Sequence, residues 1–452
     1  MLSKNRILVA AAIILLITSL RLYNVENPFS TNGIDEGIHL LQSKMVAEGY
    51  NYYDDLNGDQ APLAILGFSL FHGDVMACRY LSISLFLISA LFLFLMARRF
   101  GMDVAILSLL IISLDFTLFR ESRLASLDLF SASLLTISFY FFMRYLDASS
   151  LFHLIPASLL MSLSILSKII PVFMVAFVFI YFFIIKRKWR DMMVASIFLL
   201  IPLLLLLTLF TIPQLVEGII LRQGHRGFDF YSKASILLFI ASSFIYLVSL
   251  KKWDTKNERI LILVAWVLLI LVPLMIQGRT SQHHFVYISP PLAILSSLAI
   301  REKYEKRKML LSIFVIFNIF LAMFFVFTAP HDISYDVAGE VENITDKNEY
   351  VISGNPIVNV LANRAAPPNL TNLAKYHYPE TTLGDIIYWL EKNETRVIVL
   401  YYHLSEIKGL KEYLDNSSHW QHYKRIEGRG QILFNGLIPE FSRDVYDIYV
   451  KI

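Results

Sequence analysis

Residues 309–328 read MLLSIFVIFNIFLAMFFVFT, a stretch that holds no charged side chain. An α-helix needs about 20 consecutive apolar residues to cross the hydrocarbon core of a bilayer. The stretch therefore predicts a membrane-spanning helix. The basic run REKYEKRK at 301–308 precedes it and a polar segment follows it, so it is the last predicted span of the chain.

Similar apolar stretches occupy most of the chain before it. They lie near residues 7–20, 76–97, 104–119, 125–143, 151–167, 169–185, 192–210, 234–250, 260–277 and 284–300. Together they predict a polytopic α-helical membrane protein with about eleven transmembrane helices. The first stretch follows Lys4 and Arg6, and no small-residue cleavage site comes after it. We interpret it as a retained span whose N-terminus lies in the cytoplasm.

Composition supports a chain that uses lipid as part of its solvent. Of its 452 residues 56% are hydrophobic, above the roughly half that is usual for soluble domains. The net charge of +3 is small and the basic residues form short clusters, which does not predict a nucleic-acid partner. The single cysteine, Cys78, excludes an internal disulfide framework.

Basic clusters set the predicted orientation. From a cytoplasmic N-terminus, the dense clusters all fall in cytoplasmic loops, as the positive-inside rule requires. These clusters are Arg98 and Arg99, Arg144, KRKWR at 186–190, KKWDTKNER at 251–259 and REKYEKRK at 301–308. An odd number of spans then places the C-terminus outside. We predict a multi-pass protein of the plasma membrane with an extracytoplasmic C-terminal domain.

The chain is predicted to divide into residues 1–328, which hold the spans, and residues 329–452. The second part alternates short β-rich runs (EYVISG, RVIVLYY, QILFNG) with helix-like runs such as GDIIYWLEK. This alternation predicts a small α/β domain. Two external loops stand out by their length, at about 22–75 and 211–233, and long polar loops on a rigid scaffold commonly carry function.

Asp35 and Glu36 follow the turn sequence NGI in the first of these loops. A carboxylate there can accept a proton from a hydroxyl nucleophile, or the two acids can bind a divalent cation such as Mg, Mn or Zn. A solvated acidic loop is the plain alternative.

Several basic residues on the predicted outer side are exceptions to the positive-inside rule. They are Arg79, Arg120, Arg123, Lys168, Arg222, Arg226, Lys233 and Arg279. Basic residues near membrane depth are costly, and as a set they indicate an anionic partner. Any single one of them can also reach a lipid headgroup. His225 lies between two of these arginines and is a candidate substrate-binding residue.

Two further segments combine polar residues with a predicted helix start. Asp128 follows Arg123 in RLASLD, and Lys168 lies in ILSKIIP between two apolar runs. In GRTSQHHFVYISPP, His283, His284 and Tyr287 share an outer turn that can bind phosphate or sugar. Adjacent histidines on a helix point in different directions, so they are a weak metal signal.

The order of these motifs resembles a known superfamily. DEG at 35–37, Pro62, FHGD-xxx-CR ending at Arg79, RLASLD, LSILSKIIP and a Tyr-x-x-Pro stretch follow one another. The set is similar to that of the GT-C polyprenyl-phosphate-dependent glycosyltransferases. Within this superfamily it resembles the protein O-mannosyltransferases and the related lipid A aminoarabinose transferases.

The resemblance implies transfer of a sugar from a dolichyl or undecaprenyl phosphate carrier to a protein, lipid or glycan hydroxyl. It implies that Asp35, with Glu36 beside it, is the catalytic acid position and that Asp128 is the second one. It also implies that Lys168 and Tyr287 contact the carrier phosphate, and that Arg222 or Arg226 shares this role. HHFVYISP also allows Phe285 to align with the family tyrosine in place of Tyr287.

The chemistry of such a transfer agrees with the residues. An acceptor hydroxyl attacks the anomeric carbon while a phosphate leaves, which needs a base and a group of cations. Asp35 supplies the base, and Arg79, Arg123, Lys168 and loop arginines supply cations. Inversion follows if no covalent sugar intermediate forms. The alternative is a polytopic transporter or an exporter of lipid-linked glycans, in which the external domain only binds.

Overall fold

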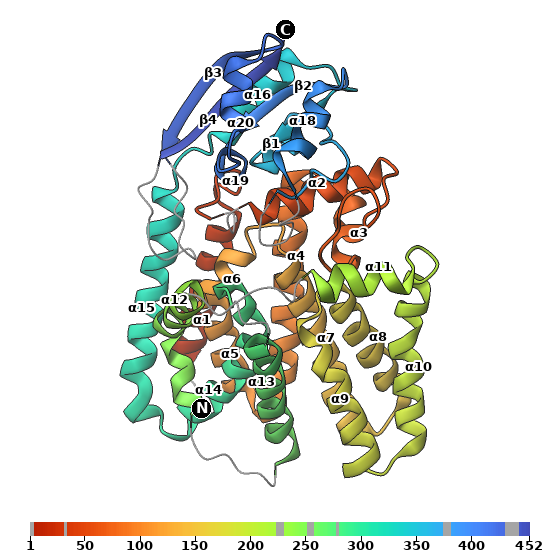
Figure 1. The fold of residues 1–452 in the computed structure, drawn as a ribbon. Coiled ribbons are helices and arrows are strands. Elements are labelled where there is room, and N and C mark those ends of the chain that lie inside the picture. The colour runs from red at the N-terminus through yellow and green to blue at the C-terminus, as the bar shows by residue number, and fades with distance from the viewer. Residues whose placement is uncertain are drawn as a thin grey trace. The chain divides into compact units, whose positions relative to one another are not determined.

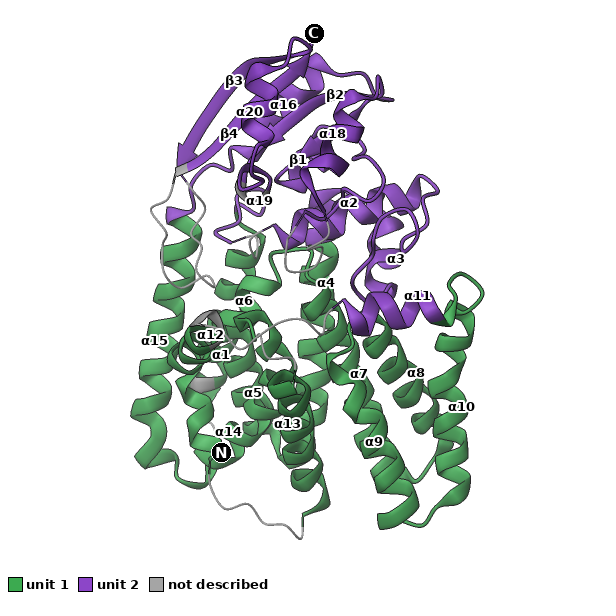
Figure 2. Cartoon of the chain, in the orientation of Figure 1, with its two compact units in different colours: residues 1–23, 80–212, 226–327 green, residues 24–79, 213–225, 328–452 purple. Residues whose placement is uncertain are grey.

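The computed structural model describes residues 4–30, 34–222, 230–250, 257–276, 280–373, 381–429 and 443–452. Figure 1 shows their helices and strands. The chain divides into two compact units, which Figure 2 colours separately. Unit 1 comprises Met1–Tyr23, Tyr80–Ile212 and Arg226–Phe327, and unit 2 comprises Asn24–Arg79, Pro213–His225 and Thr328–Ile452.

Unit 1 is built from helices, one of which begins with residues 75–79 of unit 2. They are α1 (Lys4–Leu22), α4 (Val75–Ala97), η1 (Arg98–Phe100), α5 (Met102–Leu114), α6 (Phe116–Glu121), α7 (Leu127–Ala148), α8 (Leu151–Ser167), η2 (Ile170–Val172), α9 (Phe173–Phe179), η3 (Ile180–Ile185), α10 (Trp189–Leu206), α12 (Phe230–Ser242), η5 (Phe244–Ser249), α13 (Glu258–Ile276), η6 (Gln282–Tyr287), α14 (Ser289–Glu302) and α15 (Tyr304–Thr328).

Within the described residues, 5 helical stretches are long and apolar enough to cross a membrane. They are Val75–Phe100, Leu127–Ala148, Trp189–Leu206, Glu258–Ile276 and Tyr304–Thr328. Shorter apolar helices cover Ile7–Leu22, Met102–Leu114, Leu151–Ser167, Ile170–Ile185, Ile212–Leu221 and Lys233–Ser242. The prediction of a mostly helical chain with several apolar helices is confirmed. The count of about eleven spans and their direction stay predictions.

Some predicted spans are interrupted. The stretch 104–119 divides at Asp115, whose side chain accepts a hydrogen bond from the backbone N–H of Leu118 and so begins α6 as a new helix. The stretch 234–250 divides at Ser243, between α12 and η5. The stretch 284–300 begins in the short 3-10 helix η6 before α14. Hydropathy alone does not show such breaks, because the breaking residue is embedded in an apolar run.

Serines join α7 to α8 along their length. Ser131 Oγ donates to the Ser164 carbonyl at 2.8 Å, and Ser138 Oγ donates to the Ala157 carbonyl at 2.6 Å. Small polar side chains let helices approach closely in an apolar environment. Because Ser131 is near the start of α7 and Ser164 is near the end of α8, the pairing is antiparallel. It brings the first turn of α7 beside the last turn of α8.

Unit 2 contains a four-stranded sheet. Its strands are β1 (Tyr350–Ser353), β2 (Thr395–Leu400), β3 (Trp420–Arg429) and β4 (Arg443–Lys451), in the order β1-β2-β4-β3. The pair β1–β2 is parallel, and β2–β4 and β3–β4 are antiparallel. The accompanying helices are α16 (Ser334–Ile344), α17 (Pro356–Leu361), α18 (Leu383–Glu391), α19 (Tyr402–Ser405) and α20 (Leu410–Asn416).

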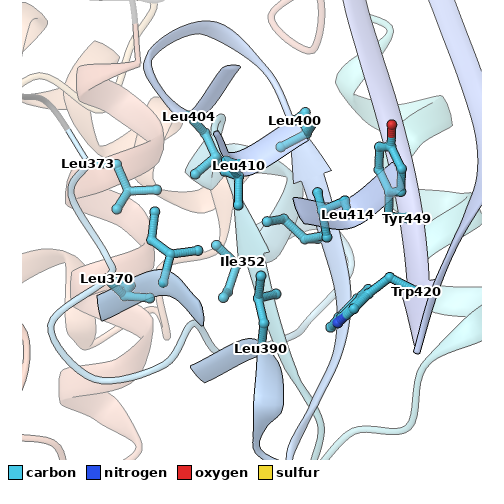
Figure 3. Packing of buried hydrophobic residues seen from close by; sticks show 12 residues of the cluster. Ile352, Leu370, Leu373, Leu390, Leu400, Leu404, Leu410, Leu414, Trp420 and Tyr449 are labelled. Carbon is cyan, nitrogen blue, oxygen red and sulfur yellow. The ribbon is translucent and has the colours of Figure 1, made fainter. Parts of the chain in front are cut away.

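The predicted runs EYVISG, RVIVLYY and GDIIYWLEK fall in β1, β2 and α18, whereas QILFNG lies outside the described residues. Strand β2 shows why RVIVLYY is apolar throughout. Ile398 and Leu400 pack into one buried cluster, which Figure 3 shows with Trp420 and Tyr449. Val397 and Val399 pack into a second cluster. Alternate side chains point to opposite faces, so both faces of this strand are buried.

The predicted first loop forms helices that belong to unit 2. These are α2 (Asp35–Ala47) and α3 (Leu63–Ser69), and the predicted second loop contributes α11 (Ile212–Val216) and η4 (Glu217–Leu221). Helix α2 packs tightly on α17, since a Cβ at Gly37 would lie 2.5 Å from the Ile357 backbone nitrogen. Gln42 Nε2 also donates to Thr371 Oγ1 at 3.3 Å. The helix that begins at Asp35 is thus held by the C-terminal segment.

Candidate functional site

Asp128 and Lys168 form a buried ion pair in unit 1. Lys168 Nζ donates to Asp128 Oδ2 at 2.8 Å, and the side chains are 12% and 6% exposed. Asp128 lies in the first turn of α7, where Ser126 is the N-cap, and Lys168 is the C-cap residue of α8. Each charge suits the helix end that it occupies. The antiparallel pairing of the two helices explains why residues 40 positions apart meet.

The histidines of η6 join this pair. His283 Nε2 lies 3.8 Å from Asp128 Oδ2, and the rings of His283 and His284 meet edge to face at 4.4 Å. One oxygen of Asp128 and one nitrogen of each histidine lie within 4.8 Å of one another. Among the described residues, this is the one group with the composition and spacing of a metal site. We call Asp128, Lys168, His283 and His284 the Asp–Lys–His cluster.

Tyr287 is fully buried, and its hydroxyl lies near Asp128. The other candidate for the family tyrosine, Phe285, stacks on Phe239 with ring centroids 4.4 Å apart. Of the two, Tyr287 is therefore the residue that lies near the Asp–Lys–His cluster.

A second polar network lies beside the cluster and was not predicted as a unit. Arg120 donates through Nε and Nη2 to Glu121 Oε1 and through Nη1 to Gln282 Oε1. Gln282 Nε2 donates to Thr117 Oγ1, and Ser126 Oγ donates to Glu121 Oε2. The sequence gives Arg120 as an outer cation, but Glu121 and Gln282 carry no motif. The signal for them is only the charged FRESR run within apolar surroundings.

Arg123 has a different set of partners. Its Nη1 donates to the carbonyl oxygens of Leu20, Arg21 and Tyr23 at 2.5, 3.1 and 2.8 Å. The last carbonyls of a helix have no partner within that helix. Arg123 therefore caps the end of α1, and its predicted phosphate contact stays a prediction.

Glu36 and Arg79 form a second buried ion pair, in unit 2. Arg79 Nε donates to Glu36 Oε1 at 2.9 Å, and Nη2 donates to Oε2 at 2.8 Å. Arg79 Nη1 donates to the carbonyls of Val25 and Glu26. Burial is the main cause of the raised pKa of nearby Asp332, while the charge of Arg79 acts to lower it and that of Glu36 to raise it.

Asp35 begins α2 and is half-buried, next to the buried Glu36. Since both oxygens of Glu36 accept hydrogen bonds from Arg79, Glu36 has little capacity left for a cation. The predicted divalent site at Asp35 and Glu36 thus has one well-disposed ligand, which fits a metal poorly.

Of the second predicted loop, only part is described. Arg222 donates to Glu217 Oε1 at 2.9 Å and to the Gly58 carbonyl at 3.3 Å within unit 2. His225 and Arg226 lie outside the described residues. The roles predicted for these three residues stay predictions.

The family model that describes dolichyl-phosphate-mannose-protein mannosyltransferases matches residues 61–216. This range includes Arg79, Asp128 and Lys168 but begins after Asp35. No curated protein matches the chain by sequence.

Solved structures match over nearly the whole fold. The crystal structure of ArnT from Cupriavidus metallidurans in the apo state is 13% identical, with a TM-score of 0.68, and 98% of each chain is covered. The same protein bound to undecaprenyl phosphate gives the same TM-score and identity over 99% of this chain and 98% of that one.

The archaeal oligosaccharyltransferase AglB from Archaeoglobus fulgidus, in complex with an inhibitory peptide and a dolichol-phosphate, is 11% identical. Its TM-score is 0.52 over 93% of this chain and 74% of that chain. At these identities the likeness shows the fold. With the family model, it confirms the resemblance of this chain to the GT-C polyprenyl-phosphate glycosyltransferases, in particular to the mannosyltransferase and ArnT group.

Proposed function

We propose that this chain is a membrane glycosyltransferase. It moves a hexose or pentose from a dolichyl or undecaprenyl phosphate carrier to a hydroxyl of a protein, lipid or glycan acceptor, at the extracytoplasmic face of the plasma membrane. The observation that carries the proposal is the Asp128–Lys168 pair, which lies within the residues matched by the mannosyltransferase family model. The undecaprenyl phosphate seen in ArnT, whose fold this chain shares, supports the same class of donor.

The cluster residues fit the demands of the leaving group. When the bond between the anomeric carbon and the phosphate oxygen breaks, the phosphate gains negative charge. Lys168 has three N–H donors and gives one of them to Asp128, so it can serve phosphate oxygens with the others. In a buried site such donors stabilise developing charge more strongly than in water.

Asp35 is the proposed general base. It takes the proton of the acceptor hydroxyl as the oxygen forms its bond to the anomeric carbon and the polyprenyl phosphate leaves. This single displacement inverts the anomeric centre and forms no sugar–enzyme bond. Glu36, bonded to Arg79 on both oxygens, is in this proposal a positioning residue for the start of α2.

The test is a transfer assay. The purified full-length chain is incubated with labelled dolichyl-phosphate or undecaprenyl-phosphate sugars and native membranes, and the protein, lipid and glycan fractions are counted. We expect label in one fraction, and a loss of about 10² to 10⁴-fold for Asp35→Asn, the range for a general base. Asp54→Asn, an exposed acid of the same predicted loop, is the matched control. Full activity of Asp35→Asn, or no transfer with any donor, contradicts the proposal.

The proposed orientation has its own test. Cys78 is the only cysteine and is buried, so Cys78→Ser gives a background for single cysteines. In whole cells, a membrane-impermeant maleimide should label Lys347→Cys, an exposed site of the C-terminal segment. It should not label Lys306→Cys, an exposed site of the 301–308 run, until the membrane is opened. The reverse pattern would invert the topology.

A further inference from the structure

A groove of about 370 Å³ runs beside the helices α1, α5 and α15 of unit 1. In the part of the chain that the structure describes, its lining is apolar except for Asn5, Tyr304 and Ser312. Val9 and Ile316, which also line it, are 59% and 69% exposed. The groove is therefore open along one side, where a membrane helix would face lipid.

The groove lies where α1 and α15 begin. Asn5, in the first turn of α1, and Tyr304, the first residue of α15, both line it. At the far ends of the two helices, the ring centroids of Tyr23 and Phe327 lie 5.4 Å apart. Helices α1 and α15 therefore run side by side in the same direction, and the groove has a defined starting end.

This starting end is distant from the Asp–Lys–His cluster. Arg123, in the segment that leads into α7, caps the opposite end of α1. The 19 residues of α1 extend about 28 Å at 1.5 Å per residue, which is close to the thickness of the hydrocarbon core. The starting end of the groove is therefore separate from the site proposed for the carrier phosphate.

Three exposed lysines lie at the starting end of the groove. Lys4 precedes Asn5 in the chain, Lys303 precedes Tyr304, and Lys306 is in the first turn of α15. Among the described residues, none of these three ammonium groups has an ion-pair or hydrogen-bond partner. The run 301–308 contains five basic and two acidic residues, so the charge at this end is positive.

An apolar groove that begins at unpaired cations matches the chemistry of an anionic glycerophospholipid. An acyl chain fits an apolar lining, and each lysine has three N–H donors for phosphate oxygens. Basic residues beside membrane helices attract anionic headgroups in the same way. A zwitterionic headgroup carries its own cation and gains less from the lysines.

We propose that the groove between α1, α5 and α15 binds one anionic glycerophospholipid. An acyl chain lies along the groove, and the headgroup phosphate lies at Lys4, Lys303 and Lys306. The proposal does not rest on sugar transfer. The isoprenoid chain of a carrier and a second copy of this protein are the competing occupants.

The first test compares two headgroups on identical chains. The purified full-length chain is titrated with dioleoyl-phosphatidylglycerol or dioleoyl-phosphatidylcholine, and the bound lipid is counted by native mass spectrometry. We expect one phosphatidylglycerol to be retained at about tenfold lower concentration than phosphatidylcholine. Equal retention of the two lipids overturns the proposal.

A triple variant tests the headgroup contact. Lys4→Gln with Lys303→Gln and Lys306→Gln should weaken phosphatidylglycerol binding by about tenfold or more and leave phosphatidylcholine binding unchanged. Its thermal midpoint in lipid-free detergent should stay near that of the unchanged protein, because the three side chains are exposed. If the preference for phosphatidylglycerol survives, the lysines do not bind the headgroup and the proposal is overturned.

A matched control removes the same charge elsewhere. Lys347→Gln with Lys408→Gln and Lys411→Gln changes three exposed lysines of unit 2. This variant should keep the preference for phosphatidylglycerol. An equal loss in both triple variants would show that only the net charge of the protein attracts the lipid, and the site would be refuted.

A separate substitution tests the acyl chain without changing any charge. Ser312→Phe fills the groove and should weaken both dioleoyl lipids by about tenfold, the effect of leaving about two methylene groups unburied. Dihexanoyl-phosphatidylglycerol, whose chains are short, should be affected less. Ser84→Phe, at an exposed serine of α4, is the matched control. Unchanged binding to Ser312→Phe overturns the proposal.

The same variants identify the competing occupants. If undecaprenyl phosphate displaces phosphatidylglycerol at equal concentration and binds Ser312→Phe more weakly, the groove holds the carrier and the proposal is wrong. If the lipid-free protein is a dimer and Ser312→Phe is a monomer, the groove is an interface between copies and the proposal is again wrong. A protein that transfers sugar but shows no phosphatidylglycerol site refutes this inference alone, and the converse result refutes only the proposed activity.

Discussion

Among the described residues, Glu36–Arg79 of unit 2 and Asp128–Lys168 of unit 1 are buried ion pairs that each join two different helices, and the two pairs differ in how fully their groups are used. In unit 2, Arg79 meets Glu36 through two parallel hydrogen bonds, and its remaining Nη1 binds two backbone carbonyls. Both side chains are at most 2% exposed. In unit 1, Lys168 meets Asp128 through one hydrogen bond, and the lysine is 12% exposed.

This difference indicates different roles. A guanidinium that uses four of its five N–H groups fixes the chain around it and has little left for a ligand. An ammonium that gives one of its three donors can bind an added anion without losing its partner. The sequence offers Arg79 and Lys168 as equivalent phosphate ligands, and the geometry favours Lys168.

The largest expected effect is on the stability of the Glu36–Arg79 pair. Glu36→Gln should lower the free energy of unfolding by about 3 to 5 kcal/mol, because it leaves the charge of Arg79 buried without its counter-ion. The amide NH₂ would also face a guanidinium donor. The measurements are the amount of protein in membranes and the thermal midpoint in detergent.

Two controls sharpen this test. Glu217→Gln removes the carboxylate of the more exposed pair with Arg222 and should change stability by about 0 to 1 kcal/mol. The double variant Glu36→Leu with Arg79→Met removes both buried charges and should be more stable than Glu36→Gln alone. A Glu36→Gln protein that is fully stable but inactive would show that this pair, too, acts in the reaction.

A change in the Asp128–Lys168 pair should affect transfer activity more than stability. Lys168→Gln keeps an N–H for Asp128 but loses the positive charge, so transfer should fall by about 10² to 10³-fold, an effect of about 3 to 4 kcal/mol. Lys168→Gln also leaves the Asp128 carboxylate without its counter-ion, but this pair is 12% and 6% exposed, so the free energy of unfolding should fall by less than it does for Glu36→Gln. Lys186→Gln, in the more exposed pair with Glu258, is the matched control and should keep both. Equal losses of stability for Lys168→Gln and Glu36→Gln would remove the distinction between the pairs.

The helices of unit 1 could be predicted from the sequence, whereas the two ion pairs could not. Long apolar runs predict the helices of unit 1 because burial in lipid depends on composition, which is local. The family resemblance gives Asp128 and Lys168 as separate site residues, and their pairing is seen only in the structure, since the serine contacts that align α7 with α8 have no motif of their own. The pairing of Glu36 with Arg79 is not readable from spacing, because it joins α2 to the start of α4 across 43 residues.

The sheet shows the same limit. Strands β1 and β2 are apolar and could be predicted, whereas β3 is mostly exposed and carries charged residues along its length. Its position comes from pairing with β4.

The smallest expected effect is on how the free energy of unfolding depends on pH near Asp332, which reports whether the Glu36–Arg79 pair is intact. Burial raises the pKa of Asp332, and hydrogen bonds from Ser334 act against it. A carboxyl whose folded pKa is raised stabilises the fold fully below its unfolded pKa of about 3.9, and this stabilisation is lost as the pH rises through the folded value. The difference in unfolding free energy between the unchanged protein and Asp332→Asn should therefore decrease from about pH 4 upward.

Each unit of pKa difference corresponds to about 1.4 kcal/mol, so the slope is measurable from thermal midpoints at several pH values. In the intact Glu36–Arg79 pair, the charge of Glu36 raises the pKa of Asp332 and so offsets the lowering by Arg79. Glu36→Gln removes this offset, and the remaining positive charge should favour the Asp332 carboxylate and flatten the slope. If the slope is the same with and without Glu36, the charges of the pair do not reach Asp332, and burial alone sets its titration.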